Sequence, residues 1–359
     1  MILTIIIAFV SLIGLIILHE LGHFITAKKF GVKVEEFGIG YPPRLFGKKI
    51  GETIYSLNLL PFGAFVKMPG EIGQTDDPRS FSNQPVLKRA LIAFAGVLSF
   101  WIIAAVLFSI VFGLGTSLAI SDEENHNLAE PRVQIVSIST DSPAAEIGIM
   151  PGDAIINIKY QEVSVKIDKV KEVQEFTNAH LGEEIVLTIQ RGKEIFDVKL
   201  MPRVSPPQGE GPIGVSLIRT AIKSYPWWSA PWQGIMATGK LTLAVIQGYS
   251  QAINNVLQGV PSGVQVMGPV GIFHLFTQAS QLGINYFLQF IGMIAVYIAL
   301  FNILPIPAVD GGKLLFLGIE AVRKKPISEK TEQNLSAFFF GLLILLMILV
   351  TIKDIARIF

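Results

Sequence analysis

Two histidines and a glutamate lie close together in the first apolar stretch of the chain, within the sequence LIILHELGHFITA. His19 and His23 are four residues apart, so on a helix both imidazoles lie on one face and can bind one metal ion. Glu20 lies on an adjacent part of the same turn, where it can reach a water at the metal without being a ligand. The HELGH sequence therefore predicts a hydrolytic zinc site.

The surroundings of this motif strengthen the prediction. Ionisable side chains in the middle of a membrane helix are costly, at roughly 2.5–3.5 kcal/mol each. A bound dication would partner all three side chains together. The alternative is that they only satisfy one another in a helix bundle, but this leaves three polar groups that need partners in lipid.

A catalytic zinc takes three protein ligands and keeps one position open for water. Asp310 is a candidate for the third ligand, in the sequence FNILPIPAVDGGK. Pro305 and Pro307 break the preceding helix and two glycines free the backbone, as expected where an unwound segment lines a polar cavity. The alternative is a solvated aspartate at a helix end. The remaining histidines are weaker candidates because of their places in the sequence: His126, His180 and His274.

The composition sets the class of protein that must hold these residues. The chain has 359 residues, of which 51% are hydrophobic and only 16% are charged, and its mean hydropathy is +0.53. These values predict a polytopic α-helical membrane protein. The net charge of +1 gives no reason to expect a nucleic-acid partner. The absence of cysteine excludes disulfides, a thiolate metal site and a cysteine nucleophile.

Four segments are long and apolar enough to cross a bilayer. The first has no basic leader and no small-residue cleavage site, so we interpret it as a retained helix rather than a signal peptide. The predicted spans are 2–27, 89–118, 283–304 and 335–352.

Lysine and arginine concentrate between spans one and two and between spans three and four. The positive-inside rule therefore places both loops in the cytoplasm. It places both termini and the long central region on the extracytoplasmic side of the membrane.

The loop between the first two spans has β character. Residues 53–59 alternate in the manner of a strand, and the sequence FGIGYPPRLFG upstream predicts a tight re-entrant loop around Gly38 and Gly40. Irregular backbone at membrane depth requires protein or a wet cavity beside it. An ordinary cytoplasmic hairpin is the alternative interpretation.

Residues 130–203 form a predicted soluble island of α+β type that resembles a PDZ domain. Ser142-Pro143-Ala144-Ala145 begins a helix, and Pro151-Gly152-Asp153 marks the turn before a strand. PDZ domains bind extended peptides by strand addition. A closed domain that acts only as a steric filter is the alternative.

Residues 204–282 contain a tryptophan cluster followed by apolar residues at helical spacing, interrupted by polar groups. This pattern favours an amphipathic helix at the membrane interface. A fifth span is the competing interpretation for residues 232–258.

The chain as a whole resembles the site-two protease family of intramembrane zinc metalloproteases, and in particular the bacterial group that cleaves anti-sigma factors. The GPVGI sequence at 268–272 also fits this family. One difference is that this chain has room for one PDZ-like domain, whereas the best-known members of that group carry two. The residues that carry the resemblance are His19, Glu20 and His23 of HExxH, and Asn302, Pro305, Pro307 and Asp310 of a second motif, NxxPxPxxDGG.

The resemblance implies roles for individual residues. Asp310 would be the third ligand of one zinc ion per chain, and Asn302 would hydrogen-bond the substrate backbone near the metal. The β-loop would hold substrate in an extended form. The substrate-binding residues expected on this basis are Asn302, Gly38, Gly40, Gly63, Pro305 and Pro307.

We therefore predict an intramembrane zinc metalloendopeptidase that cleaves single-span membrane proteins, such as anti-sigma factors or signal-peptide remnants, with Glu20 as general base. A catalytically inactive membrane scaffold that presents its PDZ-like island is the alternative, and a metal transporter is a third hypothesis. Expected partners are membrane-protein substrates, the lipid bilayer and a peptide or protein ligand of the island. The predicted parts are 1–118, 130–203, 204–282 and 283–359.

Overall fold

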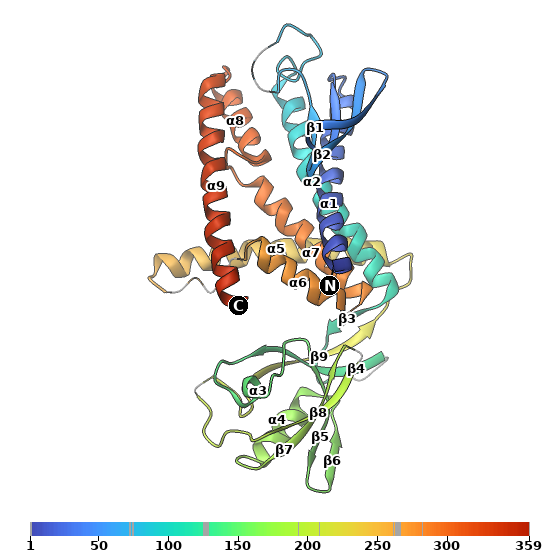
Figure 1. The fold of residues 1–359 in the computed structure, drawn as a ribbon, viewed down its shortest axis with the longest axis vertical. Coiled ribbons are helices and arrows are strands. Elements are labelled where there is room, and N and C mark those ends of the chain that lie inside the picture. The colour runs from blue at the N-terminus through green and yellow to red at the C-terminus, as the bar shows by residue number, and fades with distance from the viewer. Residues whose placement is uncertain are drawn as a thin grey trace. The chain divides into compact units, whose positions relative to one another are not determined.

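The chain forms two compact units, each with its own fold (Figure 1). Unit 1 comprises Met1–Ile110 and Trp228–Phe359, and unit 2 comprises Val111–Trp227. The structure is a computed structural model, and it describes residues 2–71, 73, 75–124, 129–192, 194–207, 209–260, 262, 267–281 and 283–358.

Unit 1 is helical apart from one β-hairpin. Four helices among the described residues are long and apolar enough to cross a membrane, which confirms the four predicted spans. The second span runs over 86–114 rather than the predicted 89–118, and it ends earlier because Gly115, directly after the helix, adopts a positive φ of 98°. The helices are α1 (Ile2–Lys29), α2 (Val86–Leu114), α5 (Ala230–Leu257), α6 (Pro269–Gln281), α7 (Ile284–Ile303), α8 (Asp310–Arg323) and α9 (Glu329–Ile358).

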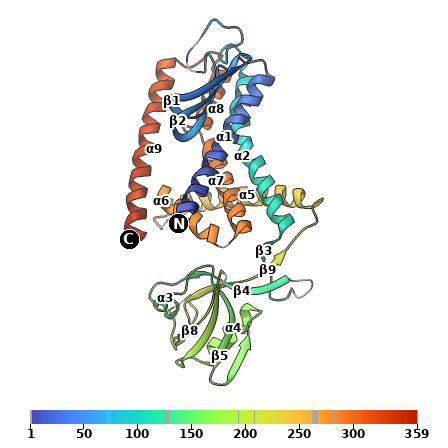
Figure 2. The same cartoon turned by 45° about the vertical axis from the view of Figure 1, so that its right-hand side comes forward.

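Helix α5 is not among the four candidate spans. It runs across the long axes of α2 and α9 in both views (Figures 1 and 2). Its small-residue face packs closely on α2, since a Cβ built on Gly234 would lie 2.4 Å from the Ala105 carbonyl oxygen. Its apolar side chains Trp232 and Leu243 are exposed. These features favour the predicted interfacial helix over a fifth span.

The β-hairpin consists of β1 (Glu36–Ile50) and β2 (Thr53–Lys67), which pair antiparallel. The first part of β1 pairs with both ends of β2, because β2 folds back on itself after Leu60. The predicted tight re-entrant loop at 37–47 is wrong in detail. This segment is strand, although its pairing with β2 is irregular, with register shifts between Glu36 and Phe46.

The hairpin lies along α1 rather than beyond its end. The Phe62 ring packs edge-on against Phe9 at 5.9 Å between centroids. Phe9 lies ten residues before His19, which is about 15 Å along a helix. Other large apolar side chains of the hairpin are exposed, including Phe46 and Leu59. This packing supports a membrane-associated hairpin over an ordinary cytoplasmic one.

Unit 2 is a sheet with two short helices, as predicted for an α+β island. Its sheet follows the order β3-β9-β4-β5-β7-β8, with β6 paired to β5. The sheet extends on both sides of the predicted range 130–203, because β3 and β9 belong to it. Its elements are β3 (Thr116–Ala119), β4 (Ala129–Ile138), α3 (Pro143–Glu146), β5 (Ala154–Tyr160), β6 (Val163–Lys166), α4 (Val170–Ala179), β7 (Ile185–Arg191), β8 (Glu194–Leu200) and β9 (Val215–Lys223).

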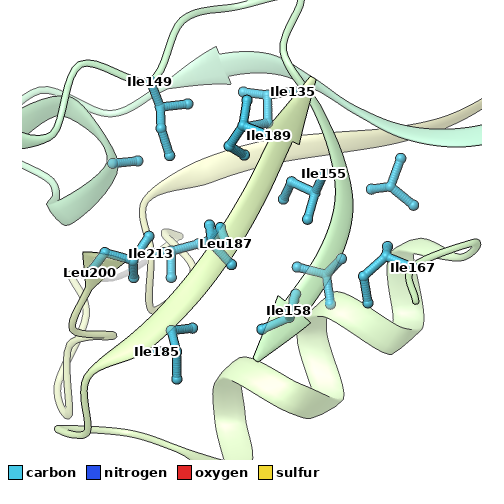
Figure 3. Close-up of a cluster of buried hydrophobic side chains, with 13 residues drawn as sticks. Ile135, Ile149, Ile155, Ile158, Ile167, Ile185, Leu187, Ile189, Leu200 and Ile213 are labelled. Atoms are coloured by element: carbon cyan, nitrogen blue, oxygen red, sulfur yellow. The ribbon is translucent and has the colours of Figure 1, made fainter. Parts of the chain in front are cut away.

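The core of unit 2 is built from branched aliphatic side chains of the central strands (Figure 3). Ile155, Ile185 and Leu187 are fully buried there. The predicted helix start is confirmed, since Ser142 caps α3 and its side-chain oxygen accepts a hydrogen bond from the Ala145 backbone N–H at 3.2 Å. The alternating pattern of the strands thus generates an independent hydrophobic core.

Candidate metal centre

Asp310 lies close to both His19 and His23, although it follows them by about 290 residues in the sequence. The Asp310 Oδ2 atom lies 3.1 Å from His19 Nε2 and 3.5 Å from His23 Nε2, and the two nitrogens are 3.3 Å apart. Zinc bonds of about 2.0–2.1 Å in a tetrahedral site place two ligand atoms about 3.3 Å apart. The three atoms therefore have the spacing that one shared zinc ion requires.

The hydrogen bonding of these groups also supports a metal site. Asp310 Oδ2 is buried and accepts no hydrogen bond from the described residues. A buried carboxylate oxygen without a donor is unfavourable unless a cation is bound to it. The donor set of two imidazoles and one carboxylate is one that catalytic zinc sites use. The residues present therefore fit a zinc ion.

The two imidazole rings of α1 contact the neighbouring helix α2. His23 Nδ1 lies 2.9 Å from the Ile92 carbonyl oxygen of α2, so this nitrogen donates and leaves the Nε2 lone pair for a metal. The His19 ring stacks on Phe100 at 4.6 Å between centroids. Gly96 of α2 lies directly under His23, because a Cβ built there would be 2.1 Å from His23 Nε2. Helix α2 thus holds both rings in place.

Asp310 is the first residue of α8 and follows a tight turn after α7. The predicted break at Pro305 and Pro307 is confirmed, since α7 ends at Ile303. The two glycines after the aspartate allow α8 to fold back closely. A Cβ on Gly311 would lie 2.0 Å from the Leu304 carbonyl oxygen. The DGG sequence therefore places the aspartate opposite α1.

Glu20 lines a cavity of about 170 Å³ together with His23 and Asp310, and we call this space the metal cavity. A water molecule occupies about 30 Å³ in the liquid, so the metal cavity has room for several. Glu20 is not part of the ligand cluster. This position is suitable for a base that acts on a water beside the ligands.

The hairpin contributes one wall of the metal cavity. Ala64 and Phe65 of β2 line it. Gly38 lies under the Phe65 ring, where a Cβ would be 2.4 Å from the nearest ring carbon. Gly40 and Gly63 have positive φ values of 77° and 111°. All three glycines therefore shape the strand that faces the metal cavity.

The other predicted residues have the following surroundings. The Asn302 side-chain amide donates to the Ile298 carbonyl oxygen of its own helix at 2.9 Å. His180 lies in unit 2, where its Nδ1 is 2.9 Å from the Phe176 carbonyl oxygen. His274 lies in α6, and His126 falls outside the described residues. Neither His180 nor His274 belongs to the cluster of possible metal ligands among the described residues.

A charged pair that sequence reasoning missed borders the site. Lys313 of α8 forms an ion pair with Glu71, and both side chains line the metal cavity. Burial alone would lower the pKa of Lys313, but the carboxylates of Glu71 and Asp310 raise it above its ordinary value, so the side chain is a cation. The only signal for this residue was its place one turn after Asp310.

A His-His-Asp cluster beside a glutamate, on helices long and apolar enough to cross a membrane, is the arrangement expected of a membrane metallopeptidase. The model of Peptidase family M50 matches residues 7–347, which is nearly the whole chain. The chain therefore belongs to peptidase family M50, and the predicted membership of the site-two protease family is confirmed. The predicted class of enzyme, a metalloendopeptidase, follows from this membership.

Similar proteins cover the same length. A protein of Clostridium perfringens, named by inference as a zinc metalloprotease, is 35% identical over 352 residues and is aligned over 98% of both chains. Zinc metalloprotease RasP of Oceanobacillus iheyensis is 28% identical over 447 residues, which covers 99% of this chain and 100% of the relative.

Among solved structures, the PDZ domain of an SdrC-like protein from Listeria monocytogenes matches 24% of this chain and 85% of its own. The sequence identity is 20% and the TM-score is 0.20. This superposition is too weak to define the fold of unit 2, whose α+β architecture rests on its own strands and helices.

Proposed function

We propose that this chain is an intramembrane zinc endopeptidase that holds one zinc ion between His19, His23 and Asp310. The observation that carries the proposal is the meeting of these three ligand atoms within 3.5 Å of one another. The names of the relatives, which include the words zinc metalloprotease, support the identity of the metal. An inactive scaffold or a transporter would have no need of Glu20 beside such a cluster.

Glu20 is the proposed general base. A bound zinc ion supplies a Lewis acid that polarises the scissile carbonyl and acidifies water. Glu20 accepts a proton from the attacking water and later donates one to the leaving amine nitrogen. Its place in the metal cavity, next to the ligands but outside the cluster, is suitable for both transfers.

The edge of the hairpin is the proposed binding surface for substrate. An intact substrate helix hides its peptide bonds, so the segment to be cleaved must first unwind. Strand addition along Gly63–Val66 would satisfy the freed backbone groups. Gly38 and Gly40 shape this strand from behind. Asn302, which precedes Pro305 and Pro307 at the end of α7, carries an amide that could hydrogen-bond the substrate backbone.

The proposed setting is a bacterial inner membrane. The basic loops support an orientation with the metal ligands near the cytoplasmic surface and with unit 2 and both termini outside. Single-span proteins, such as anti-sigma factors or signal-peptide remnants, are the proposed substrates. A peptide or protein end bound by unit 2 through strand addition is the proposed second partner.

Cleavage of a membrane-embedded peptide by the purified full-length chain tests this function. We expect cleavage with zinc, loss of cleavage with a chelator and recovery when zinc is restored. A substrate span with helix-breaking residues should be cleaved faster than a poly-leucine span of equal length. Equal cleavage of the two spans would contradict the unwinding step, and chelator-resistant cleavage would contradict the metal.

A further inference from the structure

Two cavities of unit 1 share a wall. The metal cavity lies on one side, and a second cavity of about 680 Å³ lies on the other, between α8, the start of α9 and the loop that follows the hairpin. Three residues line both cavities, namely Glu71, Phe81 and Lys313. The ion pair between Lys313 and Glu71 therefore stands at the boundary between the two spaces.

Lys313 has a special position in the charge pattern of the metal cavity. It is the only lysine or arginine among the described residues that line this cavity. The carboxylates that face the same space belong to Glu20, Asp310 and Glu71. Apart from a bound metal ion, an anion that forms in the metal cavity therefore meets three carboxylates and one cationic side chain among the lining residues.

Peptide hydrolysis forms such an anion. Water adds across the C–N bond, so the carbonyl carbon keeps the oxygen as a carboxylate and the nitrogen leaves as an amine. A new carboxylate beside Glu20 and Asp310 is repelled by both. A lysine ammonium that donates hydrogen bonds to it offsets this repulsion, because charge-assisted hydrogen bonds are the strong ones.

We propose that Lys313 binds the new carboxylate of the N-terminal cleavage product, and that Glu71 competes with this carboxylate for Lys313. When Lys313 exchanges Glu71 for the product carboxylate, the wall between the two cavities would open. The C-terminal end of this product could then pass into the second cavity. There Arg89 is the next cation, held by Glu320 through two hydrogen bonds of 2.9 and 2.5 Å. This inference rests on the proposed function, because it concerns the product of that reaction.

Two product peptides of one sequence, one ending in a carboxylate and one in an amide, test the inference. Their dissociation constants for the zinc-loaded full-length chain are measured by competition with a labelled peptide. We expect the wild type to prefer the carboxylate about tenfold, as a charge-assisted hydrogen bond would give. Lys313→Gln should abolish the preference, and Lys313→Arg should retain it. Glu71→Gln should increase the preference, because it frees the lysine.

A purely structural ion pair would give a different pattern. Lys313→Gln and Glu71→Gln would then each change the binding of the carboxylate peptide and of the amide peptide by the same factor. This result would overturn the proposal. A carboxylate preference that survives in Lys313→Gln would place the carboxylate on the metal and would also overturn it. Lys171→Gln in unit 2 is the matched control, since its side chain is 73% exposed and distant in sequence from the cavities.

The inference and the proposed function fail in different ways. A wild type that cleaves its substrate but shows no carboxylate preference contradicts the role of Lys313 alone. A wild type that prefers the carboxylate but cleaves no membrane peptide contradicts the proposed function. A wild type that binds neither peptide contradicts the role of Lys313, and its cleavage assay decides the proposed function separately.

Discussion

A Glu20→Gln variant should bind zinc as the wild type does and cleave membrane peptides about 10²- to 10⁴-fold more slowly, which is the usual contribution of general acid–base catalysis. Glutamine has the same shape as glutamate but cannot accept a proton at neutral pH. Glu20 lies outside the cluster of His19, His23 and Asp310, so the metal ligands remain intact. The loss should therefore appear in kcat, while zinc content stays unchanged.

The measurement combines single-turnover cleavage with metal analysis of the same sample. Glu175→Gln is a matched control, since Glu175 lies on α4 in unit 2 with its side chain 67% exposed. The control should cleave at the wild-type rate. Cleavage by Glu20→Gln within a few fold of wild type would contradict the assignment of the base, and loss of zinc would mean that Glu20 helps to hold the metal.

A Gly96→Ala variant should lose most of its zinc and its activity, although the substitution adds a single methyl group. A Cβ at this position would lie 2.1 Å from His23 Nε2, which is the proposed ligand atom. The ring must therefore move away from Asp310 or α2 must shift. Displacement of groups that orient a metal ligand typically lowers metal affinity by about 10- to 100-fold, and direct displacement of the ligand atom should reach at least that range.

Helix stability cannot account for such a loss. Alanine is favoured over glycine in a helix by about 1 kcal/mol, so α2 itself should become more stable. Gly14→Ala is the matched control, because a Cβ on Gly14 of α1 meets no atom within 4 Å. Zinc titration of the two variants in detergent separates the effects. Equal zinc affinity of Gly96→Ala and wild type would contradict the packing of His23 on α2.

The sequence alone was sufficient to predict the four spans, because each is a long apolar run. It was also sufficient to predict which three side chains come together, although their role as zinc ligands remains a prediction. His19 and His23 lie on one helix turn, and Asp310 follows a proline-broken helix end, where a polar cavity is expected. The catalytic role of Glu20 and the substrate roles of Asn302 and the hairpin glycines remain predictions.

What the sequence did not reveal depends on contacts between distant segments. Gly96 is one of many small residues in the second span, and only the crossing of α1 and α2 places it under His23. The pair of Lys313 and Glu71 joins residues 242 positions apart. Local patterns contain no information about such contacts.

The same limit applies to the β elements. The alternating residues of β2 were recognised, but β1 was taken for a loop because its glycines and prolines are turn residues by local preference. Pairing with β2 overrides this preference. In unit 2, β3 and β9 flank the predicted island, and their membership of the sheet depends on long-range pairing.

We propose that a single zinc ion joins the first span to α8 through His19, His23 and Asp310. The zinc content of the purified full-length chain, combined with zinc X-ray absorption, tests this for wild type and Asp310→Ala. We predict one zinc per wild-type chain, with nitrogen and oxygen ligands at about 2.0–2.1 Å, and almost none in the variant. A folded wild type without zinc, or a variant with unchanged zinc and an unchanged absorption spectrum, would contradict the claim.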